Sequence, residues 1–386
     1  MGLEDYKRVC YICSKCGMCK QWYGIALPTC PSKERFVFEA YSPCGRIEVA
    51  RAVIDKEIPY TRGLGDVIFS CTSCAACNEV VYYCGIKPLD IIEEFKATLI
   101  DEGFAPPKVR DMLENITKHG NPYGEAREKR GKWAEGLPIK RYEKEMEYLY
   151  YVGCVGSYDP RSQEIAKTFA SILLRGNVSF GILGNEEFCD GNEVLRLGEY
   201  GLFETIAKKN IKKLRELGVK KIVTISPHVY NAFKNEYPKY GGDFEVYSHV
   251  ELLRDLLKDG KLSLKEFNVK ITYHDPCFLG RYNRIYDIPR EVLTSIPGVE
   301  LVEMERNREK AFCCGGGGGN FFTDFLGGNR SPARIRVREA YATNANILAV
   351  ACPICMFMLD DAVKSEELED KLKVKDVSEI INEVIG

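Results

Sequence analysis

The sequence lacks an excess of charge of either sign. Its 54 lysines and arginines and 56 aspartates and glutamates nearly cancel, for a net charge of -2, and the two signs are mixed along the chain. Without a basic field, a protein has little that would attract nucleic acid or an anionic membrane surface. We therefore expect no nucleic-acid partner.

Long apolar runs are missing as well. The longest, residues 347–359, is too short to span a bilayer and contains Pro353. The first residues, MGLEDYKR, lack the apolar segment of a secretion signal. We expect a cytoplasmic protein, which a partner can hold at the cytoplasmic face of a membrane.

Cysteine, by contrast, is abundant: 17 of 386 residues, most of them in tight clusters. In a reducing compartment, such clusters bind metal rather than form disulfides. Ten cysteines lie in residues 1–105, among stretches with helical periodicity such as GRIEVARAVIDKE and PLDIIEEFKATLIDEG. Residues 1–105 are thus predicted to form a small helical domain organised by metal.

The rest of the chain is predicted to be α/β. Residues 106–145 are polar and charged and are expected to be a connector with a solvated surface. After them, strand-like runs alternate with amphipathic helices, which indicates mainly parallel sheets. The runs are EYLYYVGC, VSFGILG, KKIVTISP, FEVYSH, NVKITYHDPC, VELVEM, NILAVACP and KVKDV. The predicted fold class is α+β overall, with a helical domain followed by α/β units.

The α/β pattern occurs twice. Aligning YVGC with HDPC, FCDG with CCGG and SPHV with CPIC gives nearly constant offsets of 123, 125 and 126 residues. Residues 146–270 and 271–386 are therefore predicted to be two copies of one unit, related by a pseudo-twofold axis.

Two cysteine runs in the first domain predict iron-sulfur clusters. CSKCGMC and CTSCAAC each place three cysteines two residues apart, and a fourth follows each run at a distance. In two-cluster ferredoxins, the fourth ligand is exchanged between the two runs. One [4Fe-4S] cubane is thus assigned to Cys13, Cys16, Cys19 and Cys84, and the other to Cys71, Cys74, Cys77 and Cys30.

Alternatives to this assignment stay open. A structural zinc site usually has two CxxC pairs instead of a CxxCxxC run, and would leave the protein colourless and free of iron. Cys10 lies three residues before Cys13 and could replace Cys19 as a ligand. Cys44, in YSPCGR, has no other cysteine at a spacing typical of metal ligands. It is expected to be a small buried apolar residue.

The last unit contains five cysteines, one more than a cubane needs: Cys277, Cys313, Cys314, Cys352 and Cys355. The adjacent pair suggests an unusual cluster with bridging thiolates. The glycines at 315–319 match neither the dinucleotide fingerprint nor the P-loop. We expect them to let backbone pass close to a bulky cluster and leave room for a substrate sulfur.

The motifs YVGC, FCDG, YHDPCFLGRY, FCCGGGGG and ACPICMFML resemble the duplicated cysteine-rich CCG domains of the heterodisulfide reductase family, and the N-terminal runs resemble its ferredoxin module. The resemblance spans nearly the whole chain and looks most like the D-type subunit, which works with a membrane cytochrome b or a flavoprotein. It implies that the five cysteines bind a noncubane [4Fe-4S] cluster, where disulfide-like substrates are cleaved.

The first copy departs from this pattern. It keeps Cys154 and Cys189 but has Phe188 in place of the paired cysteine, and Ser226 and Val229 in place of CxxC. A noncubane cluster is not expected here. The two remaining cysteines are either buried thiols left from duplication, a redox-active or substrate-binding pair, or part of a metal site completed by other residues.

Two histidines are candidate proton donors, because imidazole exchanges protons near neutral pH. His228 lies in the altered SPHVY motif and is expected to face the remaining cluster, while His274 precedes Cys277 in HDPC. A structural role is the alternative for both.

The resulting hypothesis is an electron-transfer oxidoreductase. Electrons from a cytochrome b subunit, a flavoprotein or an electron-transferring flavoprotein would pass through two cubanes to the noncubane cluster, which would reduce or form a disulfide, trisulfide or persulfide. The substrate would be a small thiol or disulfide, or a protein-bound one. The alternative is a relay without a substrate, between a dehydrogenase or electron-transferring flavoprotein and a quinone-reactive membrane partner or cytochrome b.

Overall fold

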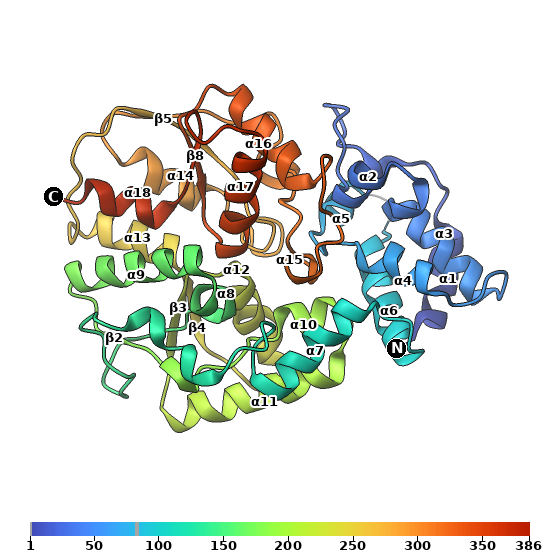
Figure 1. The fold of residues 1–386 in the computed structure, drawn as a ribbon, viewed down its shortest axis with the longest axis horizontal. Helices are drawn as coiled ribbons and strands as arrows, with labels where there is room; N and C mark the ends of the chain where they lie inside the picture. The colour runs from blue at the N-terminus through green and yellow to red at the C-terminus, as the bar shows by residue number, and fades with distance from the viewer. Residues whose placement is uncertain (1, 82–84) are drawn as a thin grey trace.

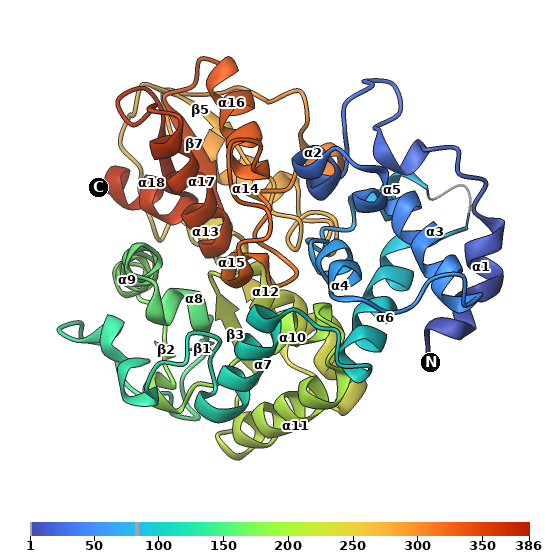
Figure 2. The same ribbon diagram turned by 45° about the vertical axis from the view of Figure 1, so that its right-hand side comes forward.

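The computed structural model describes residues 2–81 and 85–386 and contains three parts (Figure 1). The N-terminal part, coloured blue, lies against both α/β units, of which the first runs from green to yellow and the second from orange to red. Helix α15 lies beside α4, and the end of α10 lies beside α6, in both views (Figure 1, Figure 2).

The N-terminal part is helical, and the two helices expected from periodicity are present as α3 and α6. Its helices are α1 (Lys7–Ile12), α2 (Pro31–Phe36), α3 (Pro43–Ile54), α4 (Arg62–Phe69), α5 (Ala76–Val80) and α6 (Pro88–Asp101). Ile47, Phe69 and Phe95 are at most 1% exposed, so α3, α4 and α6 share one core. The ferredoxin-like character of this part stays a prediction.

Each α/β unit contains a four-stranded sheet, and every pairing within the two sheets is parallel, as predicted. The first sheet has the order β2-β1-β3-β4 and the second the equivalent order β6-β5-β7-β8. The strands are β1 (Tyr148–Tyr150), β2 (Phe180–Gly181), β3 (Lys221–Thr224), β4 (Glu245–Ser248), β5 (Val269–Tyr273), β6 (Val299–Leu301), β7 (Ile347–Val350) and β8 (Lys373–Asp376). All eight lie in the predicted runs, and the repeated order confirms the duplication.

Helices cover the sheets. In the first unit they are α8 (Gly153–Tyr158), α9 (Pro160–Arg175), α10 (Asn192–Arg196), α11 (Tyr200–Glu216), α12 (Pro227–Asn231) and α13 (His249–Lys258). In the second they are α14 (Asp287–Thr294), α15 (Asn320–Thr323), α16 (Pro332–Ala342), α17 (Pro353–Ser365) and α18 (Val377–Val384). Among the residues that the structure describes, no helix is long and apolar enough to cross a membrane.

The two units pack against each other through helices. Arg161 of α9 donates two hydrogen bonds, of 2.6 and 2.8 Å, to the two carboxylate oxygens of Glu379 on α18. Such a bidentate pair fixes orientation as well as distance. The central strands β1 and β7 are buried along their whole length, as is usual for parallel sheets covered on both faces.

The segment 106–145 differs from the solvated connector that we expected. It contains helix α7 (Pro107–His119), whose Val109, Met112 and Ile116 are at most 3% exposed. Their spacing of three and four residues places them on one helix face, and this face packs on the core. The many charges of the flanking residues obscured this short apolar stripe.

The topology brings the sequence motifs together. In each sheet, the motif residues follow the carboxyl ends of three strands: β1, β2 and β3 in the first unit, and β5, β6 and β7 in the second. Ligands of open parallel sheets bind at this edge, where the strand order reverses direction. The cysteines of each unit, spread over many residues, therefore converge at one edge.

Lys96 of α6 is fully buried and joins the N-terminal part to the first unit. Its Nζ donates to the carbonyl oxygens of Cys71, at 2.9 Å, and of Arg196, at 3.2 Å. Lys96→Met removes the ammonium that donates to both carbonyls, and each buried carbonyl left unpaired costs roughly 1–3 kcal/mol. We expect a clearly lower thermal unfolding midpoint by circular dichroism. Lys118→Met, at an exposed position of α7, should leave the midpoint unchanged.

Candidate metal centre

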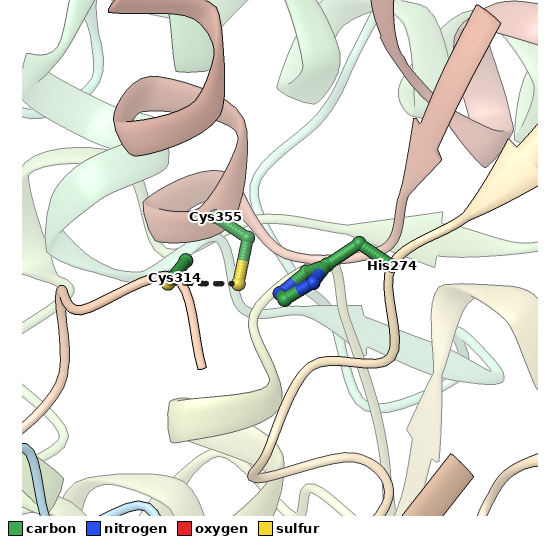
Figure 3. A group of neighbouring side chains, drawn as sticks. All are labelled: His274, Cys314 and Cys355. Atoms are coloured by element: carbon green, nitrogen blue, oxygen red, sulfur yellow. Dashed lines mark hydrogen bonds between the residues drawn. The ribbon is translucent and has the colours of Figure 1, made fainter. Parts of the chain in front are cut away.

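Five buried cysteines meet at the carboxyl edge of the second sheet. The sulfurs of Cys314 and Cys355 are 3.4 Å apart (Figure 3). Cys313 hydrogen-bonds both Cys314 and Cys277, and Cys352 hydrogen-bonds Cys355. None of the five is more than 8% exposed. Five buried thiols that lie together form a soft donor set of the kind that iron-sulfur clusters take.

His274 completes a group of three side chains with Cys314 and Cys355 (Figure 3), whose ligand atoms all lie within 4.8 Å of one another. Arg336 donates from Nε to His274 Nδ1 at 3.1 Å, which leaves Nε2 to carry the ring proton. Hydrogen bonds from Cys313 and Cys355, with His274 nearby, hold the pKa of the Cys314 thiol well below its usual range. The group can therefore hold a metal ion or deliver a proton to sulfur.

The glycine run packs against the second cysteine run of the N-terminal part. A Cβ atom on Gly317 would lie 2.7 Å from the carbonyl oxygen of Thr72, and one on Gly318 would lie 2.5 Å from that of Cys71. Gly318 also has a φ of +62°, which side chains disfavour. The glycines thus allow close contact between two cysteine-bearing loops.

The second cysteine run forms a compact site with the remote cysteine assigned to it. Cys30, Cys71, Cys74 and Cys77 line one cavity, so the four donors fit a single cluster. This cavity adjoins the five-cysteine site, because Cys74 and Cys313 are hydrogen-bonded. That hydrogen bond, with help from the guanidinium of Arg281, lowers the pKa of the Cys74 thiol to about 5.

The first cysteine run is only partly described. Cys13 and Cys16 lie toward the surface and Cys19 is buried, whereas Cys84, the predicted fourth ligand, lies outside the described residues. Cys44 is buried as expected, but it is not a purely apolar residue. A hydrogen bond from Cys19 lowers the pKa of the Cys44 thiol to about 6.

Comparison with known proteins identifies the family. A family model described as "CCG: Cysteine-rich domain" matches residues 148–234 and 271–360. The chain is 31% identical to the D-type subunit of a dihydromethanophenazine:CoB--CoM heterodisulfide reductase from Methanosarcina mazei, over 97% of this chain and 93% of that one. The chain belongs to the CCG-domain iron-sulfur oxidoreductases.

Two other relatives have higher identity to this chain. A probable iron-sulfur-binding oxidoreductase, FadF, from Bacillus subtilis is 42% identical over 82% of this chain. An EtfAB:quinone oxidoreductase from Syntrophomonas wolfei is 37% identical over the same share. The chain spans only about half the length of these two relatives, 47% and 46%.

His228 of the first CCG copy reaches the cysteines of the second. Its imidazole hydrogen-bonds Cys352, and its Nδ1 lies 2.7 Å from Glu193 Oε1. Burial disfavours the imidazolium, yet the charge of Glu193 raises the pKa of His228 well above its usual value. The other oxygen of Glu193 accepts the N–H of Gly319 at 2.6 Å, so one carboxylate joins the histidine to the glycine run.

In the first CCG copy, serine has taken over a structural role. Ser226 is the N-cap of α12, and its hydroxyl accepts the N–H of Val229 at 3.4 Å. Cys352 occupies the same position before α17 in the second copy. Cys154 and Cys189 remain close to each other and are hydrogen-bonded. Of the candidates in this copy, only His228 contacts the five-cysteine site.

Sequence reasoning missed a set of buried cations beside the sulfurs. Arg46 lies 4.0 Å from the sulfur of Cys30, Arg281 donates to the carbonyl of Cys74 at 2.6 Å, and Arg336 supports His274. All three side chains are at most 4% exposed. Such charges favour thiolates and bound clusters. Only Arg281 stands inside one of the family motifs, YHDPCFLGRY, and could have been found there.

Removal of a cavity cysteine tests the second site. Cys77→Ala should lower the iron content of purified protein by about four atoms per chain, the content of one [4Fe-4S] cluster. Val80 of the same helix is 8% exposed, close to the 9% of Cys77, but lies outside the cavity, so Val80→Ala should keep the full content. Equal iron in both variants, measured by colorimetric assay, would rule out the assignment.

The glycine contact can be tested by one added methyl group. Gly318→Ala places a Cβ against the carbonyl of Cys71 and strains the backbone, so the two cysteine loops must move apart. We expect slower reduction of the five-cysteine site by dithionite in stopped-flow spectroscopy, with little loss of iron. Gly260→Ala is the control, because its φ is also positive but its Cβ would meet open space.

Proposed function

We propose that this chain is the electron-transferring subunit of a redox complex and that its final site reduces or forms a sulfur-sulfur bond. The main support for this proposal is that the three cysteine sites adjoin one another. The segment Met18–Lys20, which contains Cys19 of the first run, packs against α5, which contains Cys77 of the second. The hydrogen bond between Cys74 and Cys313 joins the second run to the five-cysteine site. When bound, two cubanes and a noncubane cluster would supply one-electron steps and an iron atom for substrate sulfur.

The residues around the final site fit the proton requirement of this reaction. Reduction of a disulfide takes two electrons and two protons and releases two thiols. His228 and His274 each hydrogen-bond a different cysteine of the site, Cys352 and Cys314. Burial alone would raise the pKa of the Cys352 thiol, but hydrogen bonds from Cys355 and His228 lower it to about 6. These contacts support a role for the two imidazoles as proton donors to the leaving sulfurs.

The partners belong to the same proposal. Two relatives carry names that point to redox complexes, a heterodisulfide reductase and an EtfAB:quinone oxidoreductase. A cytochrome b subunit, a flavoprotein or an electron-transferring flavoprotein would supply or accept the electrons. A cytoplasmic location, with docking at the membrane through such a partner, is part of this picture.

A relay without a substrate is the second candidate. It is favoured by the higher identity of the chain to the EtfAB:quinone oxidoreductase, 37%, than to the Methanosarcina mazei heterodisulfide reductase chain, 31%. Against it stands the set of five cysteines with two histidines, because a relay needs only cubanes and no proton donors.

Thiol binding separates the two candidates. Oxidised holoprotein titrated with a small thiol such as coenzyme M or cysteine should develop a new paramagnetic signal at the five-cysteine site. The isolated subunit should also turn over a disulfide with reduced viologen as donor. A protein that transfers electrons rapidly to a quinone partner but shows neither response is a relay.

The proton-donor role makes a separate prediction. His228→Ala should lower viologen-driven disulfide turnover by about 10 to 100-fold while iron content stays full, because general acids contribute on the order of 10²-fold or more. His274→Ala should have the same effect if that side chain is a donor and not a ligand. His119→Ala, on an exposed position of α7, is the control. Unchanged turnover in both site variants would contradict the role.

A further inference from the structure

Cys154 and Cys189 of the first copy form a buried pair outside the five-cysteine site. They follow strands β1 and β2 and are 7% and 5% exposed. Their thiols hydrogen-bond each other, and the sulfur of Cys189 accepts the N–H of Gly191 at 3.4 Å. Both side chains also line one cavity, and neighbouring thiols can form a disulfide once their Cβ atoms approach to about 4 Å.

Arg130 places a fixed positive charge on this pair. Its Nη1 and Nη2 atoms each lie 3.5 Å from the sulfur of Cys154, and the residue is 1% exposed. Nη2 also donates to Glu187 Oε1 at 2.8 Å. The carboxylate of Glu187 is held in turn by the backbone N–H groups of Val152 and Gly153, at 3.0 and 2.9 Å. The guanidinium therefore has a rigid support.

The charges around the pair make its two thiols unequal. A hydrogen bond from Cys189 and the nearby Arg130 lower the pKa of the Cys154 thiol below its ordinary value. The same hydrogen bond and burial raise the pKa of the Cys189 thiol. A thiolate beside a cation, with a protonated thiol next to it, is the usual reduced state of redox-active dithiols.

The remaining positions around the pair do not complete a cluster site. The hydroxyl of Ser226 caps helix α12, and Val229 offers no ligand atom. Asp190 Oδ1 accepts the backbone N–H of Asn192 at 2.9 Å. Among the described residues, the pair thus has a cation and a hydrogen-bond network in place of further thiolates.

The pair faces the second copy across a shared cavity. This cavity is lined by Cys154, Cys189, Glu193 and His228 and, from the second copy, Ile354. His228 hydrogen-bonds Cys352 of the five-cysteine site. One histidine therefore lies between the pair and that site.

We propose that Cys154 and Cys189 are a redox-active dithiol that exchanges two electrons with the five-cysteine site, an inference that rests on the proposed function for its electron source. On oxidation, the Cys154 thiolate and the Cys189 thiol lose one proton and two electrons, and a sulfur-sulfur bond forms. The five cysteines of the second copy would hold the iron-sulfur cluster that accepts these electrons one at a time. In the reverse direction, two electrons and one proton restore the thiolate and the thiol.

Differential alkylation tests the pair directly. Anaerobic holoprotein is equilibrated with mixtures of reduced and oxidised dithiothreitol and a viologen mediator, quenched in acid, and alkylated before and after full reduction. Trypsin separates the cysteines into peptides 145–161 and 176–196, each with a single cysteine. We expect both peptides to oxidise together along one two-electron curve and to appear as a disulfide-linked species.

Variants test the coupling and the charge. Cys189→Ser should keep Cys154 free at potentials that oxidise the wild-type pair, whereas Lys118→Met, at an exposed position of α7, should leave the titration unchanged. Arg130→Gln removes the charge that stabilises the reduced pair and should favour the disulfide by about tenfold, on the order of 30 mV lower in midpoint potential. Arg130→Lys should retain most of the wild-type value. If Arg130→Gln does not fold, the Cys189→Ser result still decides.

Three results would overturn the proposal: both thiols stay free over the whole range, they oxidise independently, or Cys154→Ser lowers the iron content, which would make Cys154 a cluster ligand. The test is separable from that of the proposed function. If the pair titrates as expected but the protein forms no thiol adduct, the sulfur substrate is contradicted and the dithiol stands. If thiol adducts form but the pair does not titrate, the dithiol is contradicted and the sulfur substrate stands.

Discussion

The contact between the glycine run and the second cysteine run is the constraint on which the arrangement depends. Gly317 and Gly318 carry no Cβ, so their backbone reaches the carbonyls of Thr72 and Cys71 at distances that any side chain would prevent. This contact brings Cys313 to Cys74. Hydrogen bonds from Arg281 to the carbonyl of Cys74, at 2.6 Å, and from Tyr282 to that of Ser73, at 2.7 Å, hold the second unit against the same cysteine run.

Buried cations make these thiol-rich sites compatible with a folded core. Several thiolates in a dry interior repel one another and are costly to desolvate, unless positive groups are close. The positive groups near the two inner sites are Arg46, Lys96, Arg281 and Arg336. Arg130 repeats the arrangement beside Cys154. The same electrostatic solution thus serves both the predicted cluster ligands and the cysteine pair of the altered copy.

The two copies have the same fold but contribute different residues to the five-cysteine site. Loss of the CxxC motif in the first copy left Ser226 as a helix cap and a histidine two residues later that reaches across the interface. Glu193 holds that histidine on one oxygen and the glycine run on the other. The altered copy therefore contributes a side chain to the intact site, so its departure from the pattern is part of how the whole site is built.

Sequence alone determined the features that depend on local order. The eight strands, the duplication and the family followed from apolar runs, constant offsets and cysteine spacing, because each motif specifies a short loop at a strand end. The tertiary structure decided the contacts that the spacing of residues in the sequence cannot predict. The amphipathic helix α7, the contact of Cys44 with Cys19, the reach of His228 to Cys352 and the cations beside the sulfurs all join residues brought together only by packing. Burial in a shared core, and not sequence proximity, selects those partners.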